Sequence, residues 1–534
     1  MILRKYINIW VFLFLSCVVF AVYYPFLQFG FFSDDYHMLA IARDNQLGFW
    51  KLFTTNLLGN NIGHSYGPLY KLFFILEYKL FGLSAFGYHI MNLLLHTVIS
   101  FFIFLFVRLF TKRIYVAFVA ALFFVVLPNH TSSLAWVGVQ PHLLATVGYI
   151  GAVYWYYRFR VVSGNWRDYF LSLIFVFLGL WSKDTVITIF GVFFLIDLFV
   201  AKSFVFSCKS IKSSLLGYLP LFLIGVLYLY FRSLSTGSAA GVYNGSSIFS
   251  FVSLLLMFVE ITANMFVSFP LRFEVTSWLL NHLVVSLFLG LILLSFIFFI
   301  FKKEWRKFVF LFLIYCVSVI PFLFVSYNSI NNEGERYAYL PSVFFVIIFA
   351  LSLYYLINFF KGGKKVYLFV STLLLVLMVS FAISKQGAWV RANDLVSGIV
   401  DTQIELSGDI PVVFIGLPDN VLGAQVFRNG IFEMWRLEKN QRLFGERIPL
   451  YTFFDQENFF VDFEKIGDDY FFFSGSKTSF TGFPIFESEY GVFELQDFER
   501  RGNVGSGIKF SSNEVLPLQL VYFSNGQLYI KKIE

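Results

Sequence analysis

The chain has 534 residues, of which 58% are hydrophobic, 22% aromatic and only 14% charged. This composition is too apolar for a soluble protein of this length, and it predicts a polytopic α-helical membrane protein. The formal net charge of +7 does not indicate a nucleic-acid partner, because in a membrane protein the positions of the basic residues say more than their sum.

The first hydrophobic segment, at about residues 8–29, predicts a retained membrane anchor. It follows Arg4 and Lys5, it is long for a signal peptide, and no small-residue cleavage site precedes Asp34. We therefore expect the segment to stay in the mature chain and to cross the bilayer once.

The polar loop at 30–86 opens with the neighbouring carboxylates of Asp34 and Asp35. One interpretation is an ordinary helix end, where charges stay wetted at little cost. The other is an active-site carboxylate at the membrane surface. Later in the same loop, residues 68–80 mix apolar and charged side chains, which predicts an amphipathic helix lying on the membrane rather than crossing it.

Hydrophobic runs long enough to span a bilayer predict about eleven transmembrane helices. They lie at about 8–29, 87–107, 114–130, 139–157, 168–182, 184–201, 214–232, 284–301, 308–326, 341–360 and 366–384.

Lysine and arginine gather in every second connection, and this asymmetry predicts the orientation. The basic set is Arg4, Lys5, Arg108, Lys112, Arg113, Arg158, Arg160, Arg167, Lys202, Lys209, Lys212, Lys302, Lys303, Arg306, Lys307, Lys361, Lys364 and Lys365. These connections are expected in the cytoplasm, with the N-terminus. A span at 249–269 would break this pattern, so we expect a re-entrant or interfacial helix there. The loop at 30–86 and the chain after 384 are then extracytoplasmic.

The start of the second span carries His89, Asn92 and His96, whose spacings of three and four place them on one helix face. The two histidines are two turns apart, which is too far to hold one metal ion from the same helix, so a zinc site is not favoured. Helix packing through hydrogen bonds is the alternative role for this face.

Two cations lie at the predicted outer ends of later spans. Lys183 is followed by Asp184, with which it can form a local ion pair, or it can present its charge to an anionic lipid headgroup. Arg336 precedes Tyr337 and Tyr339, a setting that suits phosphate binding because guanidinium donates in a bidentate fork. The alternative is an arginine that extends to the membrane interface beside a tyrosine belt.

From about residue 385 the chain becomes more polar, and 385–534 predicts one small extracytoplasmic α/β or α+β domain. Strands are expected at 411–417, 470–474, 491–495 and 518–523, and a helix is expected at 420–435. We find no glycine-rich phosphate loop in this region.

Five patches together resemble the membrane-embedded glycosyltransferases of the GT-C superfamily, and within it the protein O-mannosyltransferase branch with tetratricopeptide repeats. They are residues 32–35, 64–69 with 86–96, 127–130, 182–184 and 334–342, with a weaker similarity at 386–389. The chain departs from this family at Gly67, where the pattern usually has arginine, and it lacks the repeats. The resemblance implies a GT-C-type catalytic domain over residues 1–384.

The resemblance also implies a donor, a mechanism and a set of site residues. The donor is a polyprenyl-phosphate sugar, and the acceptor hydroxyl belongs to a protein, a lipid or a cell-envelope glycan. Asp34 would deprotonate this hydroxyl, Asp35 would orient it or the donor, and a single displacement would invert the anomeric centre. Lys183 and Arg336 would offset charge on the departing phosphate. The implied sugar or phosphate contacts are His64, Tyr66, His89, His130 and Tyr339.

Other functions compete with this one. No cofactor is predicted, and a divalent metal is the less favoured alternative, because the sequence lacks the clustered outer acids of oligosaccharide-transferring relatives. A flippase or transporter for polyprenyl-linked lipids would also be polytopic and aromatic, but it predicts charged residues at midplane and repeated halves. A third alternative is an assembly protein that keeps the fold without activity.

Overall fold

The computed structural model forms two compact units. It describes residues 6–44, 49–56, 65–200, 208–238, 251–266, 278, 281–282, 290, 301, 304–324, 334–448, 450–452, 461–467, 469–474, 480–482, 485–500, 503–512, 517–524 and 527–533. Unit 1 is Met1–Gln28, Asn45–Ile330 and Gly334–Gln386, and unit 2 is Phe29–Asp44, Asn331–Glu333 and Gly387–Glu534. Unit 2 therefore combines the early Phe29–Asp44 segment with the C-terminal region, and its main boundary lies two residues after the predicted 384.

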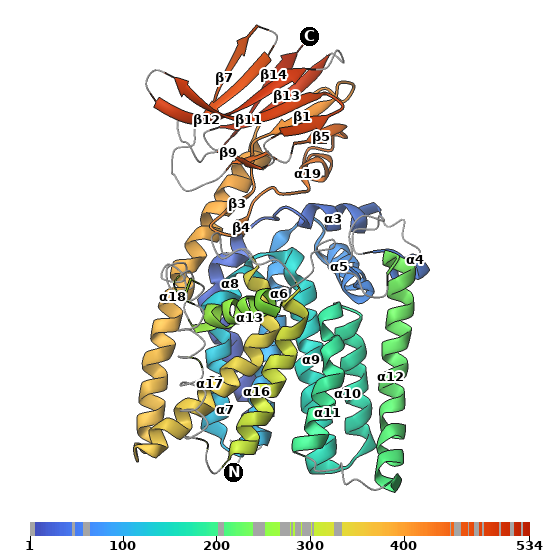
Figure 1. Cartoon of the computed structure of the whole chain (residues 1–534), viewed down its shortest axis with the longest axis vertical. Helices are drawn as coiled ribbons and strands as arrows, with labels where there is room; N and C mark the ends of the chain where they lie inside the picture. The colour runs from blue at the N-terminus through green and yellow to red at the C-terminus, as the bar shows by residue number, and fades with distance from the viewer. Residues whose placement is uncertain are drawn as a thin grey trace. The chain divides into compact units, whose positions relative to one another are not determined.

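Unit 1 is a bundle of apolar helices (Figure 1). Its longer helices are α2 (Ile7–Tyr23, continued by η1, Tyr24–Gln28), α6 (Ala85–Thr111), α7 (Ile114–Val125), α9 (Gln140–Arg158), α10 (Trp166–Leu180), α11 (Ile189–Phe199), α12 (Cys208–Thr236), α16 (Trp305–Val319), α17 (Tyr339–Phe359) and α18 (Gly363–Asp401), whose last part belongs to unit 2. Helices α9 and α10 pack closely, because a Cβ atom on Gly148 would lie 2.3 Å from Cα of Gly179.

The protein is an integral membrane protein with several spans. Within the described ranges, six helices are long and apolar enough to cross a membrane. A seventh is counted if α7 and the segment Pro128–Ala135, bent by 48° at a short break, form one span. Helix α10 has 15 residues and α11 has 11, and 15 residues reach only about 22 Å, short of the ~30 Å hydrocarbon core. The predicted span at 284–301 lies almost entirely outside the described residues. The count of eleven stays a prediction.

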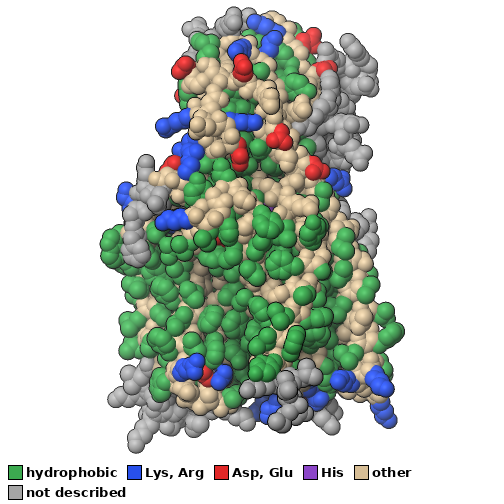
Figure 2. Space-filling model, turned by 180° about the vertical axis from the view of Figure 1, so that it is seen from behind, with side chains coloured by type: hydrophobic (Ala, Val, Ile, Leu, Met, Phe, Trp, Pro, Cys, Tyr) green, Lys and Arg blue, Asp and Glu red, His purple; other side chains and the backbone are tan. Residues whose placement is uncertain are grey.

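The basic ends of the helices meet at one end of the bundle. Three contacts join them: Arg108 Nη1 to Asn8 Oδ1 at 2.6 Å, the Arg113 guanidinium over the Tyr354 ring at 4.8 Å, and Lys307 Nζ over the Phe110 ring at 5.8 Å. Figure 2 shows hydrophobic side chains over the face of the helices, and it shows Lys and Arg side chains at the lower end of the bundle. The clustering is what the alternating connections predict; the side of the membrane stays a prediction.

Helices α13 (Phe251–Phe266) and α5 (Pro68–Phe81) are also short for a span. Helix α13 lies across the bundle in Figure 1, and α5 falls on the predicted surface helix. The charged side chains of α5 do not all face outward as an amphipathic surface helix implies, because Lys71 and Glu77 are buried. Lys71 Nζ donates to the carbonyls of Thr55 and Asn56 at 2.9 and 3.0 Å. These bonds offset the desolvation of its charge.

Unit 2 is built from mixed and antiparallel β-sheets. In the sheet ordered β14 (Gln527–Ile533), β13 (Leu518–Ser524), β1 (Val412–Ile415) and β5 (Gly445–Arg447), strand β1 runs parallel to both neighbours, with Val412 opposite Gln519. All four β1 residues are buried, as expected for a central parallel strand.

The second large sheet is antiparallel, ordered β10 (Ile485–Ser488), β11 (Gly491–Arg500), β12 (Asn503–Ser512), β8 (Asp469–Ser474) and β7 (Val461–Ile466). Three short strands form a further sheet, ordered β2 (Leu417–Pro418), β6 (Leu450–Thr452) and β9 (Phe480–Gly482). The strands predicted at 411–417, 470–474, 491–495 and 518–523 are confirmed as β1, β8, β11 and β13.

The helix predicted at 420–435 is wrong for its first part. Strands β3 (Asn420–Val421) and β4 (Ala424–Gln425) form a hairpin there, and helix α19 begins only at Ile431 and ends at Glu438. The two hairpin residues, Leu422 and Gly423, both have positive φ, at 50° and 87°. A two-residue turn of this kind matches the twist of paired strands and cannot continue a helix.

Candidate active site

The segment Phe29–Asp44, which carries the acid pair, is held within unit 2 by backbone and ring contacts. Ser33 N donates to the carbonyl of Val426 at 3.0 Å, and Gly30 N donates to Asn393 Oδ1 at 2.9 Å. The Phe32 ring meets Trp389 edge-on at 5.3 Å. These contacts fix the turn from which helix α3 (Asp35–Asp44) starts.

The two acids of this turn have different surroundings. Asp35 is fully buried, and its Oδ2 accepts a hydrogen bond from Phe32 N at 2.9 Å. Asp34 is only half-buried, and its Oδ1 accepts a hydrogen bond from Asn429 Nδ2 at 2.8 Å. Asp35 is therefore committed to the backbone of its own turn, and Asp34 is the acid with an accessible carboxylate.

A close approach of two backbones brings Asn429 to Asp34. Asn429 N donates to Ser33 Oγ at 3.0 Å, and a Cβ on the following Gly430 would lie 2.3 Å from the Ser33 carbonyl oxygen. Gly430 has φ of 82° and Ser33 has φ of 44°. Only glycine fits position 430, because it combines a left-handed backbone with no room for a side chain.

His37 and Glu433 form an ion pair one helical turn after Asp34. His37 Nδ1 lies 3.1 Å from Glu433 Oε1. Burial lowers the pKa of His37, but the hydrogen bond and charge of Glu433, with the charge of Asp34, raise the pKa above its usual value. Burial raises the pKa of Glu433, and the bond to His37 makes the net change a decrease. Sequence reasoning missed this pair, since nothing in either segment points to the other.

In unit 1, the predicted cations Lys183 and Arg336 share one neighbour. The charges of both act on the imidazole of His142, whose ring lies 5.9 Å from that of Tyr337. The Arg336 guanidinium lies 5.2 Å from the ring of Trp136 and 4.8 Å from that of Tyr337. Arginine thus stacks on two aromatic faces. The structure brings these two cations, 153 positions apart in sequence, to the same part of the bundle.

Two ion pairs, one of them with both partners buried, lie next to the cations in sequence. Glu335 pairs with Lys385, and both side chains are almost fully buried. The carboxylate of Asp184 lies 3.8 Å from the guanidinium of the buried Arg232. These pairs keep compensated charges close to Arg336 and Lys183, where an isolated buried charge would be costly.

The remaining predicted contacts are buried or lie outside the described residues. His96 Nδ1 bonds the Tyr339 hydroxyl at 2.7 Å, and His130 Nε2 bonds Ser342 Oγ at 2.8 Å. The hydroxyl of Tyr66 donates to the Phe53 carbonyl at 2.9 Å. His89 is fully buried, and His64 is outside the described residues. For His130, Tyr339 and Tyr66, these bonds favour a packing role.

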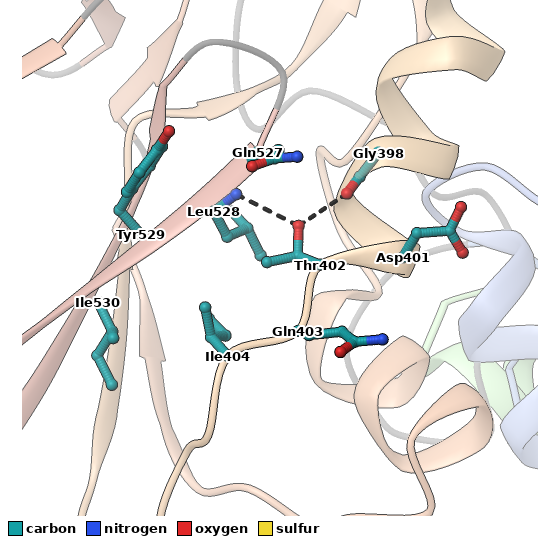
Figure 3. A pocket seen from close by; sticks show the side chains of 9 residues that line it. All are labelled: Gly398, Asp401, Thr402, Gln403, Ile404, Gln527, Leu528, Tyr529 and Ile530. Carbon is teal, nitrogen blue, oxygen red and sulfur yellow. Dashed lines mark hydrogen bonds between the residues drawn. The ribbon is translucent and has the colours of Figure 1, made fainter.

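Unit 2 also contains an open cavity, and the described residues contain no metal-binding cluster. No group of three or more His, Cys, Asp or Glu in the described part of the chain is arranged to hold a metal ion. A cavity of about 760 Å³ lies between the end of α18 and β14 (Figure 3). The Thr402 hydroxyl is already bonded to Gly398 O and Leu528 N, and the side chains of Asp401 and Tyr529 do not point toward one another.

Comparison with known proteins gives a distant relationship over part of the chain. No family model matches. Protein O-mannosyl-transferase Tmtc1 of Drosophila melanogaster is 32% identical over 184 residues, which is 32% of this chain and 21% of that protein. Protein O-mannosyl-transferase F38B6.6 of Caenorhabditis elegans is 23% identical over 353 residues, 62% of this chain and 48% of that protein. The chain is thus distantly homologous to the TMTC protein O-mannosyltransferases and spans less than half their length.

Solved structures give weaker likenesses. ArnT from Cupriavidus metallidurans bound to undecaprenyl phosphate is 10% identical, with a TM-score of 0.47 over 82% of this chain and 92% of that one. The Archaeoglobus fulgidus oligosaccharyltransferase in complex with Zn and sulfate is 12% identical, with a TM-score of 0.47 over 82% of this chain and 62% of that one.

Proposed function

We propose that the protein is a glycosyltransferase that moves a sugar from a polyprenyl-phosphate-linked donor to an acceptor hydroxyl. The observation that carries this proposal is the difference between the two acids. Asp35 is used within its turn, whereas Asp34 is half-buried and oriented by Asn429. A general base needs a positioned carboxylate that an acceptor hydroxyl can reach.

The proposed reaction is a single inverting displacement. The acceptor oxygen forms a bond to the anomeric carbon as the bond from that carbon to the phosphate oxygen breaks. The acceptor proton passes to Asp34, and polyprenyl phosphate leaves. Lys183 and Arg336 would stabilise the negative charge on the leaving phosphate, because cations held in place act where charge develops in the transition state.

We infer that the reaction takes place on the extracytoplasmic side. Arg336 lies just before the start of α17, and Tyr354, which contacts Arg113 at the basic end of the bundle, lies near its other end. Basic ends of spans favour the cytoplasm, so Arg336 would lie at the outer end. The homology to proteins named O-mannosyl-transferases makes mannose the first sugar to test and a protein hydroxyl the first acceptor.

The test is sugar transfer by the purified full chain in liposomes, supplied with polyprenyl-phosphate mannose and other polyprenyl-phosphate hexoses. We expect release of polyprenyl phosphate by the wild type and by Asp35→Asn at a reduced rate, and a loss of at least about 100-fold in Asp34→Asn. Turnover equal to that of the wild type in both variants would remove the acid pair from the mechanism. No release with any donor, while labelled lipid still crosses the bilayer, would support the flippase alternative.

A further inference from the structure

The segment that links α7 to α9 carries buried polar groups that the helices do not satisfy. Helix α7 ends at Val125, and the chain bends by 48° into η2 (Pro128–His130) and α8 (Thr131–Ala135). Non-helical backbone within a membrane bundle is tolerated where it is buried in protein or lines a polar cavity. In secondary transporters, discontinuous helices form substrate sites.

Four side chains along this bend have buried polar atoms without a hydrogen-bond partner: both atoms of the Asn129 carboxamide, His130 Nδ1, Ser133 Oγ and Trp136 Nε1. Asn129 is 2% exposed, Ser133 0% and Trp136 6%. Asn129 lies in η2, Ser133 lies in α8, and Trp136 is the extended residue that follows α8, so the three belong to one short stretch of the bend. Asn92 reaches the same segment, since its Nδ2 donates to the Leu134 carbonyl at 3.2 Å while its Oδ1 is also unsatisfied. Buried polar atoms in native proteins are almost always paired, so this group indicates a polar ligand.

The hydrogen-bonding capacity of these side chains differs from that of the neighbouring cation, Arg336. The Arg336 guanidinium stacks on Trp136 at 5.2 Å and only donates hydrogen bonds, which suits a phosphate. Asn129 and Ser133 each both donate and accept, and Trp136 donates. A phosphate cannot satisfy such a mixed set, whereas the hydroxyl groups of a sugar ring, which also donate and accept, can.

We propose that Asn129, Ser133 and Trp136 form the subsite for the sugar ring of the donor, next to Arg336, which would hold the donor phosphate. The inference rests on the proposed function and adds to it the residues that bind the sugar ring. An uncharged hexose, joined to phosphate at its anomeric carbon, is the ligand class that this pairing of a neutral polar surface with one guanidinium would take.

The test compares two ligands, polyprenyl-phosphate mannose and polyprenyl phosphate, by equilibrium binding to the purified full chain in detergent. We expect Asn129→Ala and Ser133→Ala each to weaken binding of the sugar-bearing lipid about three- to tenfold, the range of one lost hydrogen bond, and to leave binding of polyprenyl phosphate within about twofold. Arg336→Gln should weaken both lipids. Ser172→Ala, which removes a buried hydroxyl bonded to its own helix at Tyr169 O, should change neither.

Equal weakening of both lipids by Asn129→Ala and Ser133→Ala would overturn the subsite and assign these residues to packing. Unchanged binding of both lipids would overturn it as well, since the unsatisfied atoms would then hold only water. A melting temperature of Asn129→Ala in detergent equal to that of the wild type would show that its loss of binding does not come from misfolding. A wild type that binds both lipids equally and transfers no sugar contradicts the proposed function itself, whereas transfer that these variants leave unchanged contradicts only the subsite.

Discussion

Asn429 Nδ2 donates a 2.8 Å hydrogen bond to Oδ1 of Asp34, joining residues 395 positions apart in sequence. The bond links the C-terminal region to the first loop of the chain. It gives that region a role in holding the proposed base, beyond binding or covering a substrate.

Asn429→Ala should lower the turnover number about 10- to 100-fold with little change in KM for the donor. Asn429→Asp should lower the turnover number further, because a second carboxylate repels that of Asp34 and displaces it. Steady-state transfer kinetics with both variants measure the effect. The matched control is Asn358→Ala, which removes an amide that bonds only its own helix at Tyr354 O. A rise in KM alone would show that Asn429 binds substrate instead of positioning the base.

Gly430→Ala should destabilise unit 2 more than Gly467→Ala. Both glycines have positive φ, 82° and 64°, so both substitutions incur the left-handed backbone penalty of about 1–2 kcal/mol. Only Gly430 also faces a backbone atom, the Ser33 carbonyl oxygen at 2.3 Å, whereas nothing lies within 4 Å at Gly467. Both variants share the backbone penalty, so the difference between their unfolding midpoints in denaturant measures the cost of the contact with the Ser33 carbonyl oxygen. Equal midpoints would mean that the Ser33 turn moves away freely.

The His37–Glu433 pair should stabilise unit 2 most at mildly acidic pH. The raised pKa of His37 contributes stability below about pH 6.5, its ordinary value, and this is lost as pH rises through the folded pKa. The lowered pKa of Glu433 contributes above about pH 4.5 and is lost as pH falls through its folded pKa. Both contributions are present between these values, although the charge of Arg447 opposes protonation of His37.

Thermal unfolding of Glu433→Gln at pH 5.5 and pH 8.5 measures this dependence. We expect the melting temperature to fall more at pH 5.5 than at pH 8.5, relative to wild type. The exposed Glu405 provides the control, since Glu405→Gln removes the same charge without a partner histidine. A larger fall at the higher pH would contradict the assigned charges.

Breaking the Glu335–Lys385 pair should be costly, and replacing both partners should be much less so. Lys385→Met leaves the carboxylate of Glu335 buried without its partner cation, and such a loss typically costs about 3–5 kcal/mol. The double variant Lys385→Met with Glu335→Leu should recover most of this stability, because two apolar side chains need no compensation. The measurement is the fraction of each variant that stays folded in detergent as the temperature is raised. Additive losses in the double variant would show that the two charges act independently.

The hydrophobic runs were sufficient to predict the longer helices of unit 1 and four of the strands of unit 2. A helix such as α6 or α17 is determined by its own apolar side chains, because a backbone in lipid must satisfy its hydrogen bonds internally. Strands β1 and β13 could be predicted as elements for a similar reason, since each is a short apolar run. The hairpin at 420–425 was missed because its turn depends on positive φ at Leu422 as well as Gly423, and leucine does not signal that conformation.

Tertiary structure alone decided which residues of the candidate site meet. The sequence marks Asp34 and Asp35 as a pair but contains nothing that separates them; burial of Asp35 and the bond from Asn429 do so. His37 and Glu433, or Lys183 and Arg336 around His142, come together only when distant segments pack. The physical reason is the range of the interactions: propensity and hydrophobic pattern act within a few turns of chain, whereas hydrogen bonds and ion pairs depend on distance in space, which the fold determines.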